Sequence, residues 1–143
     1  MAKSDSFEND FLKLIFNGTT IANIADNAAS SPLTNLYVSL HTADPGDAGN
    51  QTTSEATYTG YARVAVSRDT DGWTVSGNGV TNADAITFGA CSAGSNTLTH
   101  FAVGTAANGT GKVLYHGELS ASLAVSAGIT PAFAAGELDI TES

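Results

Sequence analysis

The sequence predicts an all-β fold, an antiparallel β-sandwich or jelly roll of about eight short strands with a short N-terminal helix. Larger apolar residues alternate with small or polar ones in short segments, which is the period of a half-buried strand. Clusters of Gly, Pro, Asp and Asn separate these segments, and no helical pattern intervenes, which argues against a parallel α/β sheet. The segments predicted to be extended are 36–41, 61–66, 73–76, 80–88, 98–104, 112–119, 122–125, 129–133 and 138–141.

A short helix is predicted near the N-terminus. Asp5 is a capping acceptor, Glu8 follows three residues later as in a capping box, and Asn17-Gly18 supplies a left-handed stop. The apolar face is wide, so it needs cover on more than one side, either from its own domain or from a neighbouring subunit. Its members are Phe7, Phe11, Leu14 and Ile15, with Leu12 and Phe16 added.

The length of 143 residues corresponds to one domain. We expect residues 1–35, the helix and an Ala/Asn/Thr/Ser-rich connector, to form an arm, and residues 36–143 to form the sandwich. The strands at 36–41 and 61–66 are joined by a long loop that contains Pro45-Gly46. With such a loop the two strands need not be neighbours, and crossing connections fit better than a tight hairpin.

The charge balance excludes several classes of partner. Charged residues make up only 13% of the chain, and 14 acids against 5 bases give a formal net charge of −9. This argues against direct binding to nucleic acid or to anionic membranes. No apolar run approaches membrane-spanning length and no signal-peptide pattern opens the chain, so we expect assembly in a cytoplasm. The weakly charged surface suits packing against copies of the chain or a larger assembly, and also suits a secreted β domain.

Three histidines, His41, His100 and His116, lie in predicted strands. They could form a metal site, but their wide separation favours ordinary hydrogen-bonded histidines. The segment Asp69–Gly72 resembles the start of a calcium loop, yet Trp73 stands where an oxygen ligand is needed and no glutamate follows at the required distance.

Other candidate sites are equally weak. Asp44 and Asp47 could hold a cation, although aspartates in such turns usually accept backbone N–H groups. Gly89–Ala93 resembles a nucleophile elbow only loosely, because a turn follows where a helix is required. The single cysteine, Cys91, cannot form an intrachain disulfide and is expected to be a small buried residue.

Aromatic residues offer one more possibility, since they could line a sugar groove, but they serve more often as core or cross-strand packing. These residues are Tyr58, Tyr61, Trp73 and Tyr115. Paired acids such as Glu55 with Asp47 cannot be placed in space from sequence. We therefore expect no catalytic, cofactor-binding or metal-binding residues, and a protein that is not an enzyme.

Several motifs along the chain resemble those of small phage structural proteins. The first two are LYVSLHTADPGDAG at Leu36–Gly49 and TGYARVAV at Thr59–Val66. Four more motifs follow: a D-I-T-F strand with one insertion, a T-H-F strand, an L-Y-x-G strand and a closing G-x-L-D-I-T. They correspond to Asp84–Phe88, Thr99–Phe101, Leu114–Gly117 and Gly136–Thr141.

Proteins with this pattern resemble the head decoration, or cementing, proteins of short-tailed phages, and similar sequences are labelled small tail-fibre proteins. The resemblance implies a jelly roll and a homotrimer that binds the major capsid protein on the outside of the virion capsid and stabilises the head. It carries no catalytic residues. The alternative is a tail-fibre or receptor- or carbohydrate-binding tail component. Either protein would be assembled in the host bacterial cytoplasm.

Overall fold

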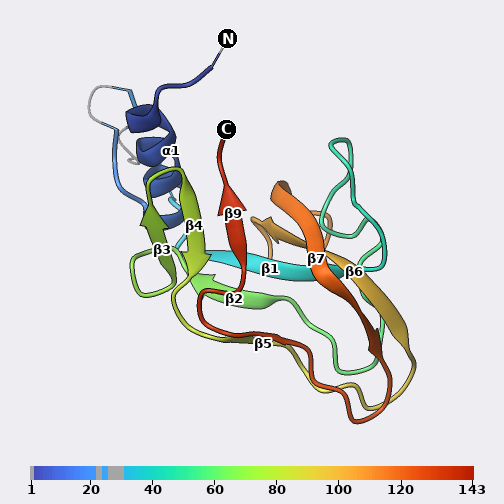
Figure 1. Cartoon of the computed structure of the whole chain (residues 1–143). Coiled ribbons are helices and arrows are strands. Elements are labelled where there is room, and N and C mark those ends of the chain that lie inside the picture. The colour runs from blue at the N-terminus through green and yellow to red at the C-terminus, as the bar shows by residue number, and fades with distance from the viewer. Residues whose placement is uncertain (1, 22–23, 26–30) are drawn as a thin grey trace. The chain divides into compact units, whose positions relative to one another are not determined.

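The computed structural model describes residues 2–21, 24–25 and 31–143, which form one helix and nine strands (Figure 1). The elements are α1 (Asp5–Asn17), β1 (Asn35–His41), β2 (Val64–Ser67), β3 (Trp73–Ser76), β4 (Gly79–Asn82), β5 (Ile86–Thr87), β6 (Asn96–Gly104), β7 (Val113–Val125), β8 (Ala132–Phe133) and β9 (Asp139–Thr141). The strands form sheets in the orders β2-β1-β6-β7, β3-β4-β9 and β5-β8. The mostly β, antiparallel architecture is confirmed, whereas the jelly-roll arrangement stays a prediction.

The folded chain groups into two compact units. The helical unit comprises Met1–Asn35, Val66–Ile86 and Phe133–Ser143, and the sheet unit comprises Leu36–Ala65 and Thr87–Ala132. The predicted arm, residues 1–35, is thus grouped with two later segments of the chain. Its separation from a sandwich at 36–143 stays a prediction, and residues 22–23 and 26–30 of its connector lie outside the described residues.

In the helical unit, α1 forms where the sequence predicts it, with its cap one residue earlier. Ser4 caps the helix and accepts a hydrogen bond from the Phe7 N–H at 3.4 Å, and Gly18 ends it with a φ of 64°. The predicted wide apolar face is confirmed in part: Leu12 and Phe16 are fully buried and Phe11, Leu14 and Ile15 are half-buried, while Phe7 is 38% exposed. Among the described strands, β3 and β4 make the main contacts with the helix.

The helix is held to β3 by aromatic packing and to the segment after β2 by an arginine. The Phe16 and Trp73 rings meet edge to face with centroids 4.8 Å apart. Arg68 donates through Nε to the Ile15 carbonyl at 2.7 Å and through Nη2 to the Leu14 carbonyl at 2.6 Å. These carbonyls lie in the last turn of the helix, where backbone acceptors lack intrahelical partners.

Asn82 explains why the predicted strand 80–88 divides into β4 and β5. Its side chain is 1% exposed. Its amide donates to the Asp84 and Ala134 carbonyls at 2.8 and 2.9 Å, and its oxygen accepts the Leu138 N–H at 2.9 Å. A side chain that bonds to nearby backbone competes with the strand ladder, so the ladder ends at Asn82.

The sheet unit is built on β1 and β6, which pair in register with Leu40 opposite Phe101. Three predictions need correction. β2 begins at Val64 and not at Tyr61. β1 and β2 are neighbours in the sheet despite the long loop between them. The predicted strands 112–119 and 122–125 belong to one strand, β7, which pairs with β6 at both of its ends, and residues 119–122 stand opposite the single residue Thr99 in one of two register shifts.

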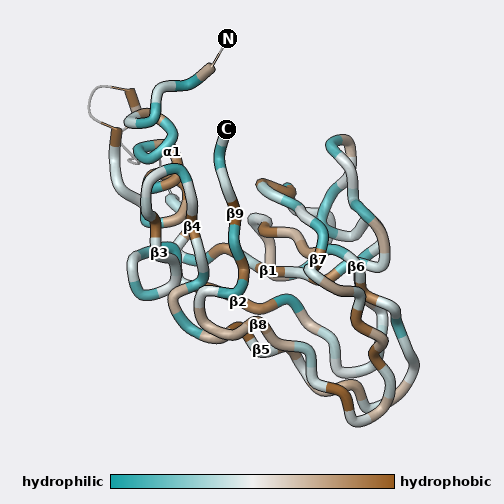
Figure 2. The backbone as a smooth tube through the Cα atoms, viewed as in Figure 1, coloured by the Kyte–Doolittle hydropathy of each residue, from teal (hydrophilic) through white to brown (hydrophobic). Residues whose placement is uncertain are grey.

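The core of the sheet unit consists of side chains from β1, β6 and the end of β7. Leu36, Val38, Leu98, Val103 and Val125 are at most 1% exposed. In Figure 2 the chain around the β5 and β8 labels is brown or pale, which marks hydrophobic or neutral residues. Teal, hydrophilic residues are frequent where the chain leads into α1. Among the described residues, α1 is the only helix and it is too short to cross a membrane.

Candidate functional site

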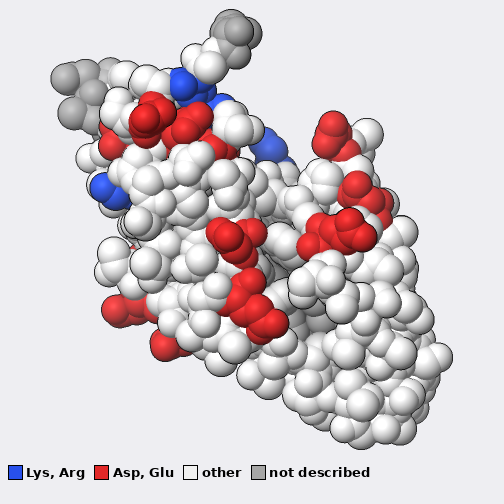
Figure 3. Space-filling view, in the orientation of Figure 1, with Lys and Arg blue, Asp and Glu red and all other residues white. Residues whose placement is uncertain are grey.

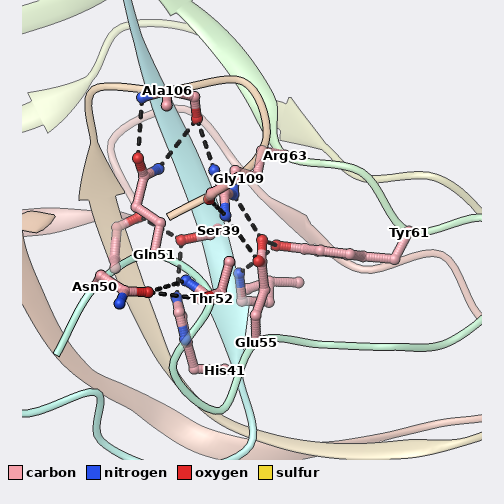
Figure 4. A network of polar contacts seen from close by, with 12 residues as sticks. Ser39, His41, Asn50, Gln51, Thr52, Glu55, Tyr61, Arg63, Ala106 and Gly109 are labelled. Atoms are coloured by element: carbon pink, nitrogen blue, oxygen red, sulfur yellow. Dashed lines mark hydrogen bonds and ion pairs between the residues drawn. The ribbon is translucent and has the colours of Figure 1, made fainter. Parts of the chain in front are cut away.

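A polar network fixes the long loop, residues 42–63, to the hairpin loop, residues 105–112, within the sheet unit (Figure 4). Some of its side chains come from β1 and the rest from the long loop. Its members are Ser39, His41, Gln51, Glu55, Tyr61 and Arg63. Their partners in the hairpin loop are backbone groups of Ala106, Gly109 and Thr110.

Arg63 and Glu55 form the charged part of the polar network. The Arg63 Nε and Nη2 atoms donate to the two Glu55 carboxylate oxygens at 2.7 and 2.8 Å, a bidentate arrangement. Arg63 also donates to the carbonyls of Ala106 at 2.9 Å and Gly109 at 2.7 Å. The hydrogen bonds to Glu55 raise the pKa of Arg63. With its side chain 3% exposed, this guanidinium stays charged and joins the two loops.

Tyr61 joins the charged pair to strand β1. Its hydroxyl donates to Glu55 at 2.8 Å and accepts the Leu40 N–H at 3.1 Å. Burial raises the pKa of Tyr61, so the hydroxyl remains protonated and can donate at neutral pH. Its ring lies edge to face against Tyr58 and is stacked on Phe88, with centroids 5.5 and 6.2 Å away.

Gln51 is fully buried, as are the network members Ser39 and His41. Its side-chain oxygen accepts the Ala106 N–H at 2.9 Å, its amide donates to the Ala106 carbonyl at 3.2 Å, and its backbone N–H donates to Thr110 at 2.8 Å. A Cβ atom on Gly104 or on Gly111 would collide with this side chain. Glycine at both positions therefore makes the space that Gln51 fills.

His41 is buried beneath the long loop. Nδ1 lies 2.8 Å from the Thr53 carbonyl and Nε2 lies 2.8 Å from the Ser39 hydroxyl. Burial lowers the pKa of His41, so the neutral ring is favoured. In that form Nδ1–H donates to Thr53 and Nε2 accepts from Ser39.

His116 on β7 lies between the two aspartates that the sequence analysis considered for a cation. Nδ1 is 2.9 Å from Asp44 and Nε2 is 3.4 Å from Asp47. Asp44 also accepts the Gly46 N–H at 2.9 Å, and this bond, with His116 as a further cause, lowers the pKa of Asp44. Both ring nitrogens therefore face carboxylates, which leaves neither positioned as a ligand for a metal ion.

The other candidates are placed apart from one another. Asp69 accepts the Ser67 hydroxyl and the Asp71 and Gly72 N–H groups, so its carboxylate serves its own turn. His100 lies opposite His41 across β1 and β6 and contacts Thr99. Within the described ranges, no group of three or more His, Cys, Asp or Glu residues is arranged to hold a metal ion.

Cys91 of the loose nucleophile elbow and two of the four aromatic rings considered for a sugar groove are core residues. Cys91 is 2% exposed, and its sulfur contacts the Ala93 and Gly94 carbonyls, as expected for a small core residue. Tyr58 and Trp73 are buried at 3% and 0% exposure, so the interpretation as core packing is confirmed for these two rings. The Tyr58 hydroxyl donates to the Gly89 carbonyl at 2.9 Å.

Sequence reasoning identified neither Gln51 nor the pairing of Glu55 with Arg63. Both depend on contacts between segments that are distant along the chain, and the Gln51-Thr52-Thr53 segment has the composition of an ordinary loop. Arg63 bonds to Glu55 and to carbonyls of the hairpin loop, and the Gln51 amide bonds to the Ala106 backbone, so the network holds the two loops together.

The chain as a whole is similar in sequence to a known family. The family model described as Podophage GP4 fiber I protein gp80 matches residues 2–141 of the chain. No curated protein matches the chain.

Proposed function

The chain belongs to the Podophage GP4 fiber I protein gp80 family and is a phage structural protein, and from this premise we propose that it is a subunit of a virion fibre. The observation that carries the proposal is the family match, which extends over residues 2–141 and so includes both compact units. The tail-fibre interpretation, the alternative in the sequence analysis, thereby becomes the leading one.

The geometry of the sheet unit supports a structural role. The long loop is held by buried bonds among Gln51, Glu55 and Arg63 and the hairpin loop. Such a loop loses little conformational entropy when it docks against another protein, because it is already ordered. We propose a protein that is not an enzyme, whose partners are other virion proteins and not nucleic acid or membrane.

Capsid decoration is the second candidate. It is favoured by the resemblance of Leu36–Gly49 and Thr59–Val66 to head-decoration proteins. In that function the chain would form a homotrimer on the capsid exterior, contact the major capsid protein, and stabilise the head. It would act through many modest contacts that symmetry multiplies.

The two functions differ in the number of copies per virion. We would measure the ratio of this chain to the major capsid protein in purified virions by quantitative mass spectrometry, and locate the chain with gold-labelled antibody. A few copies to a few dozen, with label at the tail, is the expected result for a fibre. A ratio near one to one with label over the head would establish decoration, and absence from purified virions would refute both.

A further inference from the structure

The chain contains three Asn-Gly sequences, Asn17-Gly18, Asn78-Gly79 and Asn108-Gly109. Asparagine is among the thermolabile residues, and a following glycine has no Cβ to block the approach of its backbone nitrogen to the asparagine side chain. That nitrogen can attack Cγ, close a succinimide ring and expel ammonia. Water then opens the ring at either carbonyl and leaves aspartate or isoaspartate. The fold decides which of the three sequences can react in this way.

Asn17-Gly18 is held at both reacting groups. The Asn17 side-chain amide donates to the Trp73 carbonyl at 3.0 Å in a partly buried contact. The Gly18 N–H, which carries the attacking nitrogen, donates to the Lys13 carbonyl where α1 ends. Both hydrogen bonds must open before the nitrogen can reach the side chain, so the helix end protects this sequence.

Asn78-Gly79 is held in the turn between β3 and β4. The Asn78 side-chain amide donates to the Glu142 carbonyl at 3.1 Å, and the Asn78 carbonyl accepts the Glu142 N–H at 2.8 Å. Gly79 is the first residue of β4 and lies between Ser76 of β3 and Thr141 of β9. Reaction here requires local opening of the small sheet and of the chain segment that follows β9.

Asn108-Gly109 lies at the exposed end of the hairpin loop and lacks these restraints. Both residues are exposed. Within the described residues, no hydrogen bond involves the Asn108 side chain or the Gly109 N–H. The Gly109 carbonyl alone is bonded, to Arg63 at 2.7 Å (Figure 4). Nothing lies within 4 Å of a Cβ placed on Gly109, so the loop has room for the ring to form.

We propose that Asn108-Gly109 is a site of spontaneous deamidation in the folded protein, and that the isoaspartyl product loosens the polar network. Water is the co-reactant. The side-chain amide nitrogen leaves as ammonia and takes the proton of the Gly109 N–H, and a carboxyl group replaces the amide. The chain gains one negative charge. This inference is independent of whether the virion carries the chain on a fibre or on the capsid.

The isoaspartyl product changes the backbone as well as the charge, because the main chain then runs through the side-chain carbons and gains an atom. The loop is fixed on both sides of this atom. Gln51 bonds to the Ala106 N–H and carbonyl at 2.9 and 3.2 Å, and its backbone N–H donates to the Thr110 carbonyl at 2.8 Å. The Gly109 carbonyl lies between these two anchors, so we expect it to leave Arg63, whose side chain is 3% exposed.

The first test is peptide mapping of the full chain after incubation in mildly alkaline buffer, folded and unfolded in urea. Mass spectrometry with electron-transfer fragmentation distinguishes aspartate from isoaspartate. Each sequence is compared with itself, so the effect of neighbouring residues on its intrinsic rate cancels. Folding should slow Asn17 and Asn78 at least about tenfold more than Asn108, because their hydrogen bonds must open first. Equal slowing of all three, or the greatest slowing at Asn108, would overturn the site.

The second test asks whether the product loosens the network. Wild-type and Asn108→Ser chains are aged together and unfolded in urea. Aged wild type should unfold at a lower urea concentration than fresh wild type, whereas Asn108→Ser should not change. Asn108→Asp, which adds the charge without the backbone atom, should match fresh wild type. Unchanged unfolding of chains shown to carry isoaspartate at position 108 would overturn the loosening, as would an equal loss in Asn108→Ser or Asn108→Asp.

Discussion

Arg63 shows how a charged side chain becomes part of a protein interior. It is 3% exposed in its side chain, yet three different acceptors, Glu55, Ala106 and Gly109, receive its hydrogen bonds. Only a guanidinium offers donors in a planar fork that can meet a carboxylate and two carbonyls at once. Burying such a charge is tolerable because each donor that leaves water gains a partner.

At Gln51 we expect a large loss of stability from a small change. Gln51→Ala removes the side-chain partners of the Ala106 N–H and leaves a cavity between Gly104 and Gly111. The unfolding free energy should fall by about 2–4 kcal/mol. Urea denaturation measures this, with Thr110→Ala as the exposed control, expected to cost less than about 0.5 kcal/mol. Equal effects of the two substitutions would show that Gln51 does not hold the loops.

Because of His41, we expect the folded protein to lose stability in mild acid. Burial lowers its pKa from the ordinary 6.5, so the unfolded chain binds a proton at a higher pH than the folded chain does. The stability that the folded state gains from the neutral His41 ring is complete above about pH 6.5. It is lost as the pH falls towards the lowered pKa, by at most about 1.4 kcal/mol per pH unit. Glu55, which favours the charged ring, and Arg63 and His100, which oppose it, also act on His41.

Chemical denaturation between pH 7 and about pH 5 tests this, because most carboxylates titrate lower. His41→Gln should be less stable at pH 7 and should lose less stability than the wild type across this window. The two proteins differ only at position 41, so the comparison isolates the effect of His41. Parallel pH profiles of the two proteins would exclude His41 as the source.

At the scale of elements, close backbone crossings shape the sheet unit. Gly60 adopts a φ of 105°, and a Cβ atom there would collide with the Ala90 carbonyl. A Cβ on Gly89 would in turn collide with the Gly60 carbonyl. The Ser92 N–H donates to Thr59 and the Thr59 N–H donates to Ala93, at 2.9 and 3.0 Å, so the two segments are bonded at the crossing.

A comparison of Gly60→Ala with Gly109→Ala distinguishes the steric cost of a side chain at this crossing from the cost of a positive φ alone. Both glycines have positive φ, but nothing lies within 4 Å of a Cβ on Gly109. Gly109→Ala should cost about 1–2 kcal/mol, the penalty for a left-handed alanine. Gly60→Ala adds a collision with rigid backbone and should cost more than about 3 kcal/mol. Thermal or urea unfolding would measure both, and equal costs would mean that the crossing opens without resistance.

At the scale of the whole molecule, the chain passes between its two units after Asn35, Ala65, Ile86 and Ala132. No single cut separates the units, so each is assembled from distant pieces of sequence. The helical unit needs Leu12 and Phe16 from the first piece and Trp73 from the second. The acids are distributed unevenly along the chain, which leaves the end of the sheet unit around the second half of β7 uncharged (Figure 3).

The sequence by itself determined the β class, the helix near residues 5–17 and most strand positions, because alternation, capping and turn residues act locally. It also indicated a phage structural protein, because the motifs span the chain, and the family match supports that class, whereas the head-decoration interpretation stays a prediction. Only the tertiary structure decided that β1 and β2 are neighbours, that the two predicted segments of β7 belong to one strand, and that Arg63 bonds to Glu55 and two carbonyls. These features depend on which distant groups meet once the chain is compact, and hydrogen-bonding partners of that kind leave no periodic mark in a sequence.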